Sequence, residues 1–523
     1  MGKYLIKRLL HGVVSIIIVV GIVMVMIYSL LDRRMIFAQD PVWSKQQANQ
    51  KTTYMYQKWE NYGYLDYIPY GEYLQGLLRS GEITEEVRAE AASIGRTADK
   101  DSEIAAKYVE QFTQYYRSQG YTVERLDAVM TGRKLAKGGQ QVIFAHKDHP
   151  LTHRLWNYLT GLVQVDNIHK VEEDVGERGI TFTWHDPVYD DGRLSPAIIG
   201  NGTMHKYLFY MDDQFPFFHQ NIASIHLGAS YTVNTGIDVF TTMTKTQGSY
   251  VLSPMTFPSG LQEESADDLH SATYQAGSRE NNPVNADRFT DDYTNVETIK
   301  RGMSKMGYSF VIGIISVVMA YIMGVPIGIL MAQKKDKFVD KLGTIYIVFI
   351  TAVPSLAYIF LFKAIGTSVF GLPGAFDMES TSKLMYILPI VSLALPSVAG
   401  LMKWMRRYMI DQMNSDYVKF ARSSGLTEGE IFSKHIMKNA SIPIVHGIPG
   451  SILGAMVGAI ITERIYVVPG AGNLLTEAIN KYDNGVIVGV TLFYAVLSVV
   501  SIILGDILMT TVDPRISFTT KDR

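Results

Sequence analysis

Three histidines that lie close together form the nearest approach to a metal-binding cluster in this sequence of 523 residues. His146, His149 and His153 lie beside or near Asp148. Imidazole and carboxylate groups are ordinary ligands of zinc and other transition metals, but the spacing matches no established ligand pattern. A metal site is conceivable here, but we expect none.

Motifs that carry nucleotide or hydrolytic chemistry do not occur in the sequence. It holds no Gly-x-x-x-x-Gly-Lys-Ser/Thr phosphate loop, no dinucleotide fingerprint, no His-Glu-x-x-His and no Gly-x-Ser-x-Gly elbow. It also holds no cysteine, which excludes disulfides and thiolate metal sites. We therefore expect that the chain is not an enzyme, binds no cofactor itself and has no nucleic acid among its partners.

Six apolar segments are long enough to cross a bilayer, which takes roughly 20 residues each. They lie near Leu9–Leu31, Tyr308–Gln333, Leu342–Phe362, Leu384–Met402, Ile444–Ile461 and Val486–Met509. Prolines interrupt several of them, and such kinks are tolerated where neighbours or a water-lined cavity satisfy the freed backbone. The charged residues Lys363, Glu463 and Asp506 lie at or near span ends. Because carriers driven by ions or protons usually keep charge near mid-bilayer, we expect energy for any uphill transport to come from elsewhere.

Lys and Arg in short loops mark the cytoplasmic side of a membrane protein. They are frequent at the N-terminus, after the second and fourth spans and in the C-terminal tail, and rare in the opposite loops. Six spans with both termini in the cytoplasm fit this alternation. Residues 32–300 then lie outside the cell, and they hold 25 Lys and Arg against 36 Asp and Glu.

The first span could be a secretory signal peptide or an uncleaved anchor. The basic residues Lys3, Lys7 and Arg8 at its start fit both. Its apolar stretch of about 23 residues exceeds the usual 7–15 of a cleavable core. Asp32 and Arg33 follow it in place of a small-residue cleavage site. We expect an anchor.

The block 32–300 is predicted to be an α+β domain inserted between the first two spans. Residues 41–128 are predicted to be mostly helical, because apolar residues recur at helical spacing, as in Glu103–Tyr116. Alternating or apolar runs predict strands at Gln141–Ala145, Gly179–Trp184 and Tyr207–Met211.

Two further parts of this block stand out by their composition. The polar residues 258–296 are predicted to form a long loop or linker back to the membrane. The aromatic cluster within 207–218 is either core or an outward patch for a partner protein or the bilayer surface.

Between the fourth and fifth spans, the sequence predicts a short helix with a glycine stop. Asn414 or Ser415 can cap a helix that runs to about Ser424. Asp416 then lies at the positive end of the helix dipole. Gly425 suits the left-handed position that ends a helix.

A second helix is predicted directly after this stop. Thr427 and Glu430 match a capping box. The helix would continue through His435 and Asn439 to Pro443, where the fifth span begins. The two helices would form a stiff knob at the membrane surface, on which a soluble partner could push.

The pattern Asp-Tyr-Val-x-x-Ala-Arg-x-x-Gly-Leu at 416–426, with His, Asn and Pro after it, resembles the coupling segment of ABC-transporter permeases. More narrowly, it resembles the oligopeptide/dipeptide (OppB-like) branch of bacterial importers. Further matching fragments are Gly324–Gly328, Val353–Ser355, Glu463–Asn473, Asp513–Arg515, Trp156–Leu159 and His226–Tyr231. The resemblance covers 1–31 and about 300–523. The outer block exceeds the family's usual first loop and resembles that of the AmiC-type subunit.

The resemblance implies a type I ABC importer permease, with six transmembrane helices in an all-α membrane domain. Residues 1–31 would be the first transmembrane helix, 32–300 the extracellular domain and linker, and 301–523 a five-helix core with the coupling segment 403–443. The implied partners are a second permease, two cytoplasmic ATPase subunits that use ATP and Mg, and an extracellular peptide-binding protein or lipoprotein. The implied role is import of peptides across the plasma membrane.

The resemblance also implies site residues. Those that would sit in a groove of an ATPase subunit are Asp416, Tyr417, Ala421, Arg422, Gly425, Leu426 and His435. Pro469, Gly470 and Gly472 make a tight outer turn before a short helix, which is either part of a gate or a plain connection. Gly450, Gly454 and Gly458 form a ladder of small residues that allows close helix packing, within the chain or on a partner subunit.

A second hypothesis is a membrane-anchored receptor or sensor whose extracellular domain binds a ligand or partner. A sensor usually needs a cytoplasmic output domain, and the sequence shows none. For the outer block we expect a role in docking or guiding the binding protein above the mouth, and a purely structural cap is the alternative.

Overall fold

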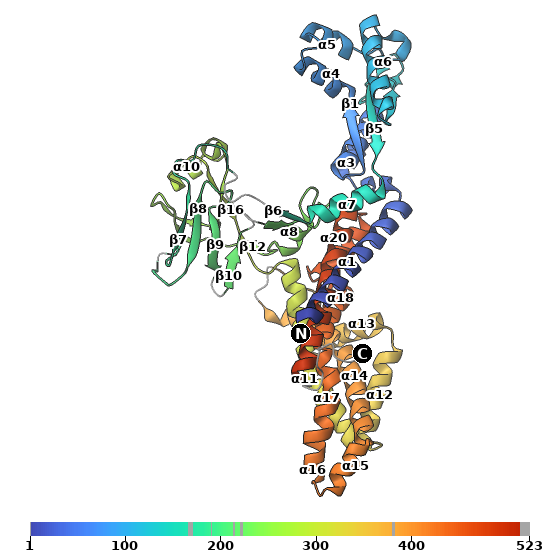
Figure 1. The fold of residues 1–523 in the computed structure, drawn as a ribbon, viewed down its shortest axis with the longest axis vertical. Helices are drawn as coiled ribbons and strands as arrows, with labels where there is room; N and C mark the ends of the chain where they lie inside the picture. The colour runs from blue at the N-terminus through green and yellow to red at the C-terminus, as the bar shows by residue number, and fades with distance from the viewer. Residues whose placement is uncertain are drawn as a thin grey trace.

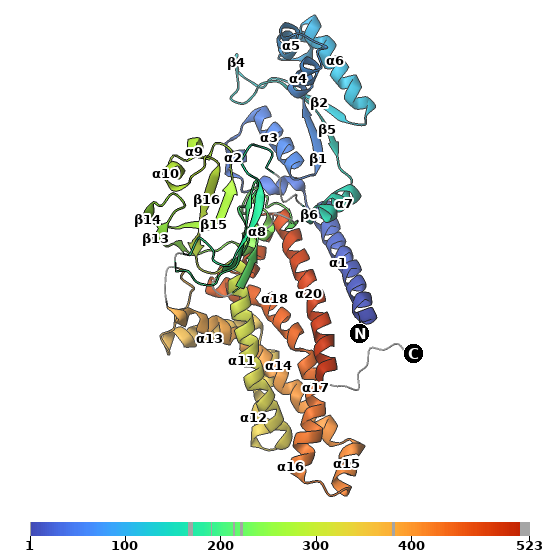
Figure 2. The same cartoon turned by 60° about the vertical axis from the view of Figure 1, so that its left-hand side comes forward.

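The computed structural model describes residues 2–165, 171–189, 191–212, 215–219, 223–378 and 382–512. A bundle of long helices carries two lobes at one end and a helical knob at the other (Figures 1 and 2). The long helices are α1 (Gly2–Leu30), α11 (Lys305–Gln333), α14 (Ile387–Met413), α18 (Ile448–Tyr466) and α20 (Asn484–Val512). Within the described ranges, five helices are long and apolar enough to cross a membrane, or up to six if a bent pair counts as one span.

The bent pair falls where a single third span was predicted. Helices α12 (Phe338–Ala352) and α13 (Ser355–Ser368) meet at 113°. Pro354 cannot continue the helical hydrogen bonding, and Val353 before it has extended backbone angles. The predicted apolar span over Leu342–Phe362 is therefore divided into two helices at Pro354, one of the prolines that interrupt the spans.

The fourth and fifth spans are displaced from their predicted bounds. The fourth continues to Met413 and starts with the turn η3 (Lys383–Tyr386). The fifth begins at Ile448, because α17 (Lys438–His446) includes Pro443 and ends before Gly447. The C-terminal fragment Asp513–Arg515 lies outside the described residues.

Two glycines of the fragment Gly324–Gly328 let α14 lie directly against α11. A Cβ atom at Gly324 would come within 2.8 Å of the Leu401 Cβ atom, and one at Gly328 within 2.8 Å of the Met405 Cβ atom. Larger side chains at these two positions would push the helices apart. On the other side of the bundle, α1 packs along α20.

Residues 33–150, which we call the upper lobe, form a three-stranded antiparallel sheet with helices around it. The sheet order is β1-β5-β2. The strands are β1 (Leu65–Pro69), β2 (Thr122–Leu126), β3 (Met130–Thr131), β4 (Lys134–Leu135) and β5 (Val142–Asp148). The helices are η1 (Arg33–Phe37), α2 (Pro41–Lys45), α3 (Ala48–Asn61), α4 (Tyr70–Arg79), α5 (Glu85–Ala92), η2 (Ala98–Lys100) and α6 (Glu103–Ser118). The helical prediction for 41–128 is confirmed in the main, but it missed β1 and β2.

Residues 171–219 and 249–301, which we call the side lobe, are mostly strands. The largest sheet has the order β10-β9-β8-β7 and is antiparallel. Its strands are β7 (Gly179–Thr183), β8 (Ala197–Asn201), β9 (Tyr207–Asp212) and β10 (Phe215–Phe218). The other elements of the lobe are β12 (Ser249–Tyr250), β13 (Ser253–Thr256), β14 (Gln262–Ser265), β15 (Asp267–Tyr274), α9 (Ser278–Asn281), α10 (Asn285–Arg288), β16 (Thr294–Thr298) and β17 (Lys300–Arg301). The three predicted strands of the block correspond to β5, β7 and β9.

A junction joins both lobes to the helices. It consists of α7 (Leu151–Gly161), β6 (Val163–Val165), β11 (Ala223–Ile225) and α8 (Val239–Thr244). Strands β6 and β11 pair with each other, and α8 packs against α11 and α20. Figure 1 shows the upper lobe above the ends of α1 and α20 and the side lobe beside them.

The prediction that residues 258–296 form a loop or linker is wrong. Strands β15 and β16 pair across it, and Leu269 and Phe289 are buried against Phe257. Arg288 forms ion pairs with Glu263 and the buried Asp267. The polar composition alone indicated a linker. In the folded lobe, however, the charged groups of the segment pair with one another, so a polar segment can be folded here.

Candidate functional site

The knob lies at the end of the bundle farthest from the lobes (Figure 2). Its first helix, α15, runs over Asp416–Ser423 and confirms the prediction. Ser415 is the N-cap residue, but its side chain makes no capping hydrogen bond. Its hydroxyl instead donates to the carbonyl oxygen of Gln412 at 2.6 Å, so the predicted side-chain cap is wrong.

The glycine stop after α15 has the predicted geometry. Gly425 has φ = +84°, in the left-handed region that a residue with a Cβ atom rarely adopts. The Gly425 N–H donates to the Arg422 carbonyl at 3.1 Å, and the Leu426 N–H donates to the Ala421 carbonyl at 3.3 Å. These two bonds are those of a Schellman motif, which satisfies the last carbonyls of a helix.

The second arm of the knob starts with the predicted capping box. The Glu430 N–H donates to Thr427 Oγ1 at 3.3 Å, and the Thr427 N–H donates to Glu430 Oε2 at 3.2 Å. The arm comprises α16 (Glu428–Glu430), a π-helical segment η4 (Ile431–Met437) and α17. His435 is half-buried within the π-helical turn.

One face of the knob is fixed to the bundle. Val418, Ala421 and Ile431 are buried in a cluster with Met405 and Met409 of α14. Tyr417 lies at the edge of this cluster and donates a hydrogen bond to Gln412 Oε1 at 2.8 Å, while Leu426 packs against it. Movement of the knob would therefore be passed directly to α14.

The opposite face of the knob is exposed. Phe420 is 74% exposed, and the ion pairs Arg422–Glu428 (2.5 Å) and Lys419–Asp416 (2.8 Å) lie beside it in the chain. Sequence reasoning did not name Phe420 as a site residue, although the helical pattern predicts that it is exposed. It lies between Val418 and the other buried positions in the chain and so falls off the apolar face of the helix.

A charge pair behind the knob joins α12 to α14. Arg406 Nε donates to Asp340 Oδ1 at 2.5 Å, and its Nη2 donates to Oδ2 at 2.7 Å. The Asp340 side chain is only 4% exposed. In the sequence, Arg406 counted only as one of several basic residues, because nothing local shows that it meets Asp340 across the bundle.

The turn Pro469–Gly472 at the lobe end of the bundle closes over a buried carboxylate. Glu463 is fully buried, accepts from Ser309 Oγ at 2.5 Å and accepts from the Asn473 N–H at 3.0 Å. Asn473 lies in the first turn of α19 (Ala471–Asn480), where a negative charge is favourable. A Cβ atom at Gly470 would come within 2.3 Å of the Glu463 carboxyl carbon, so a larger residue here would displace the buried carboxylate.

The far end of α19 leads to a second buried carboxylate, Asp483. It accepts hydrogen bonds from Ser230 Oγ (2.7 Å) and from the N–H groups of Tyr231 (2.9 Å), Thr232 (2.8 Å), Val233 (2.8 Å) and Val486 (3.1 Å). The fragment His226–Tyr231 thus lies across the start of α20. A Cβ atom at Gly485 would come within 1.9 Å of the Ala229 carbonyl oxygen. Sequence reasoning noted the fragment but missed Asp483, because the two lie far apart in the chain.

Aromatic and basic side chains reinforce the same junction. The Arg154 guanidinium lies 3.6 Å from the ring centre of Tyr28 at the end of α1 and 3.8 Å from that of Tyr64 in the upper lobe. Asn484 Nδ2 donates to the Tyr64 hydroxyl at 2.8 Å. The upper lobe is therefore tied to both α1 and α20.

The small-residue ladder is open on this chain. A Cβ atom at Gly450 or Gly454 would meet no atom within 4 Å. Gly458 follows on α18, and its surroundings lie outside what the structure describes. Packing among the residues that the structure describes does not account for the first two glycines.

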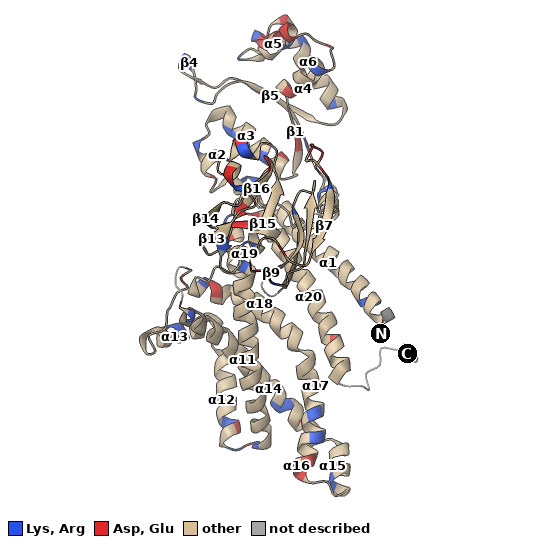
Figure 3. Ribbon diagram, turned by 90° about the vertical axis from the view of Figure 1, so that its left-hand side faces the viewer, with Lys and Arg blue, Asp and Glu red and all other residues tan. Residues whose placement is uncertain are grey.

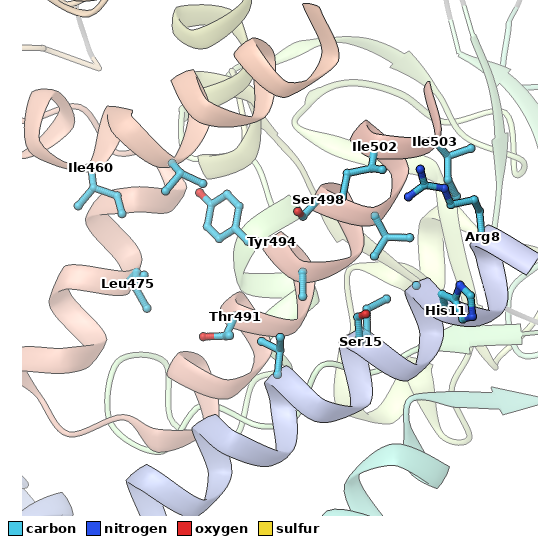
Figure 4. A pocket seen from close by; sticks show the side chains of 16 residues that line it. Arg8, His11, Ser15, Ile460, Leu475, Thr491, Tyr494, Ser498, Ile502 and Ile503 are labelled. Carbon is cyan, nitrogen blue, oxygen red and sulfur yellow. The ribbon is translucent and has the colours of Figure 1, made fainter. Parts of the chain in front are cut away.

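A cavity of about 510 Å³ runs between α1, α18 and α20 (Figure 4). Most of its lining is apolar, with hydroxyl groups from Ser15, Thr491, Tyr494 and Ser498. At one end Arg8 pairs with Asp506 at 3.2 Å.

The three histidines of the upper lobe and its junction make ordinary contacts. His149 Nε2 lies 2.9 Å from Asp66 Oδ1, His146 Nε2 lies 3.3 Å from Glu124 Oε1, and the His153 ring lies against that of His149. In the described part of the chain, no group of three or more His, Cys, Asp or Glu residues could hold a metal ion.

Comparison with known proteins shows the family to which this chain belongs. The family model described as "Binding-protein-dependent transport system inner membrane component" matches residues 324–518. The oligopeptide transport system permease protein AmiC of Streptococcus pneumoniae is 32% identical over 532 residues, which cover 100% of this chain and 99% of that protein. The chain belongs to the oligopeptide family of ABC-transporter permeases.

More distant relatives match only part of the permease. The dipeptide transport system permease protein DppB of Lactococcus lactis is 29% identical over 227 residues, 43% of this chain and 73% of that protein. A solved structure of the MetNI methionine ABC transporter covers 39% of the chain at 13% identity, with a TM-score of 0.33. The similarity to AmiC extends through both lobes, so the enlarged block is shared with that relative.

The family settles two questions that the sequence left open. The relatives are named as permease subunits, so the chain is a transport subunit and not itself an enzyme. The receptor or sensor hypothesis finds no support among them.

Proposed function

We propose that this permease forms half of the translocation path of an ATP-driven oligopeptide importer in the plasma membrane. Peptide as the substrate is supported by the relative AmiC, an oligopeptide transport system permease protein that aligns with this chain over 99% of its own length. The single observation that carries the coupling role is the knob 416–443, with one face fixed to α14 and the other exposed. A rigid element of this kind can transmit a push into the bundle.

In this proposal the knob is cytoplasmic and fits a groove of an ATPase subunit. The contacting residues are Asp416, Tyr417, Ala421, Arg422, Gly425, Leu426 and His435, to which we add Phe420. Two ATPase subunits bind ATP and Mg, and their closure moves the knob and switches the path between outward and inward access. Both chain termini are then cytoplasmic, and the two lobes are extracellular. Within the helical bundle, Lys and Arg lie mainly toward the knob end (Figure 3), which supports this orientation.

A second permease completes the path. Gly450 and Gly454 offer a close-packing surface that no described segment of this chain fills, as expected for a type I heterodimer. The cavity between α1, α18 and α20 is a second candidate region, which would either contact the partner permease or form part of the translocation path. The bent pair α12–α13 counts as the third of six spans. The turn at Pro469, Gly470 and Gly472 with α19 would form part of the outer gate.

The coupling role is tested with the assembled transporter in nanodiscs. Gly425→Asp and Arg422→Glu should each reduce peptide-stimulated ATP hydrolysis and peptide uptake by about tenfold or more, since each disturbs the shape or charge of the contact. Lys337→Glu, an exposed basic position between α11 and α12 and outside the coupling segment 403–443, is the control. Normal uptake and hydrolysis in both knob variants would disprove the proposal.

For the lobes we propose that they guide an extracellular peptide-binding protein or lipoprotein to the mouth. Deleting residues 41–150 should impair peptide delivery while the shortened permease still inserts and assembles. Unchanged uptake by a stably inserted deletion variant would reduce the upper lobe to a structural cap.

A further inference from the structure

One face of the four-stranded sheet in the side lobe carries exposed aromatic side chains. Phe182 of β7, Ile198 of β8, Phe209 of β9 and Phe218 of β10 are direct cross-strand neighbours and so form a row. Ile180 and Trp184 lie two positions on either side of Phe182 and extend the row along β7. We call these six residues the aromatic face: Ile180, Phe182, Trp184, Ile198, Phe209 and Phe218.

The aromatic face is exposed, whereas the reverse side of the sheet packs against β15 at Tyr210. Phe182 is 51% exposed, Trp184 60% and Phe218 68%. On the reverse side, Tyr210 stacks on His270 of β15 with ring centres 4.1 Å apart. Within the cluster 207–218, Tyr207 is buried and Phe218 is exposed, so the cluster contributes to both the core and the surface. An exposed apolar group of this kind marks an interaction surface.

The face lies in the most acidic part of the chain. Residues 171–300 hold 7 Lys and Arg against 19 Asp and Glu, whereas residues 32–170 hold 18 against 17. Four exposed acidic residues directly precede β7: Glu172, Glu173, Asp174 and Glu177. Another exposed carboxylate, Asp191, lies in the connection to β8. These exposed carboxylates lie in the segments that directly flank β7, and we call them the acidic rim of the aromatic face.

This charge discriminates between possible occupants. An anionic membrane surface repels a lobe with this excess of carboxylates. A second copy of the chain would bring like charges together, which is costly at an interface. A surface with an apolar centre and a ring of Lys and Arg satisfies both the aromatic face and its rim, in the arrangement typical of protein interfaces.

We propose that the aromatic face docks the extracellular peptide-binding protein through an apolar patch ringed by Lys and Arg. This inference rests on the proposed function and names the surface that it uses. The side lobe stands beside the outer ends of the long helices (Figures 1 and 2), so a protein held there lies near the outer end of the bundle. Phe182, Trp184 and Phe218 would be the energetic centre, since aromatic residues dominate such contacts.

The test measures the affinity of the purified peptide-binding protein of the same system for the assembled transporter in nanodiscs. Phe182→Ser, Trp184→Ser and Phe218→Ser combined should weaken binding by about tenfold or more. Tyr250→Ser with Leu252→Ser is the control, because both residues are similarly exposed in the same lobe. It should change binding less than about twofold.

A second variant isolates the rim. Glu172→Gln, Glu173→Gln and Glu177→Gln combined should weaken binding by about threefold at low salt, and the difference should shrink as salt screens the charges. Binding of the aromatic variant within twofold of the unaltered transporter would overturn the inference. A second result would also overturn it. In that result the unaltered transporter binds anionic vesicles, and the aromatic variant loses this vesicle binding but keeps its full affinity for the binding protein.

Failure of the inference is distinguishable from failure of the proposed function. If the unaltered transporter shows no uptake stimulated by the binding protein, the proposed function fails. If uptake is normal and the aromatic variant retains full affinity, only the docking surface is wrong. Circular dichroism and resistance to protease of each variant verify that the side lobe remains folded.

Discussion

The knob and the aromatic face are exposed apolar surfaces at opposite ends of the molecule, and they are built in different ways. The knob presents Phe420 from one short helix whose buried face is fixed to α14. The aromatic face is assembled from four strands and stands on a lobe that reaches the helices through the junction at Asp483. A contiguous segment encodes the first surface, whereas the second exists only after the sheet forms. The contacts that fix each surface to the long helices can be broken separately.

The largest expected effect concerns the mounting of the knob. Arg406→Ala leaves the buried Asp340 carboxylate without its cation and should lower the free energy of unfolding by about 3–5 kcal/mol. Arg407→Ala is the control, because its partner Asp411 is 4.0 Å away and both side chains are exposed. That change should cost less than about 0.5 kcal/mol. Thermal unfolding of the purified permease measures the loss of stability in each variant. Equal losses in the two variants would show that the Arg406–Asp340 pair does not help to fix the knob to the bundle.

The mounting of the lobes should respond next. Asp483→Ala leaves the Ser230 hydroxyl and several N–H groups without an acceptor and should destabilise the junction by about 2–4 kcal/mol. Hydrogen exchange of residues 226–233 should accelerate, while the knob should exchange as before. Glu477→Ala, which breaks an ion pair on α19, is the control and should leave exchange at 226–233 unchanged. Acceleration in the knob as well would contradict the separate mountings.

Much of the knob could be predicted because its signals are local. The glycine at φ > 0, the Thr427–Glu430 capping box and the amphipathic helix each depend on a few neighbouring residues. Asp340–Arg406 and Asp483 with 230–233 could not be predicted, since each joins segments far apart in sequence. The polar composition of 258–296 was misleading for the same reason: Arg288 and its carboxylates cancel one another only in the folded lobe.

The stability of the side lobe, in which His270 lies behind the aromatic face, should depend on pH. Burial lowers the pKa of His270, but its hydrogen bonds with Asp186 and Asp268 and the charges of these carboxylates outweigh this and raise the pKa to about 9. A raised pKa stabilises the folded lobe fully below the unfolded value of about 6.5 and loses this contribution as pH rises through about 9. The loss should amount to about 1–3 kcal/mol. His270→Gln should remove this pH dependence in thermal unfolding, and an unchanged profile would exclude His270 as its source.

The smallest effect should come from the shape of the knob alone. Gly425→Ala places a Cβ atom at φ = +84° and should cost about 1 kcal/mol locally. Hydrogen exchange at Leu426 should rise modestly with global stability nearly unchanged. Gly429→Ala, a helical position of the same knob, is the control and should not raise it.

The central claim, that the knob is the contact to an ATPase subunit, can be tested directly because the chain holds no cysteine. Phe420→Cys introduces a single thiol at the exposed tip, and Phe338→Cys places one at another exposed phenylalanine, which lies outside the knob. In the assembled transporter, a short thiol-to-amine crosslinker should join Cys at 420, but not Cys at 338, to an ATPase subunit. Absence of a crosslink from position 420, with position 338 crosslinked instead, would contradict the account.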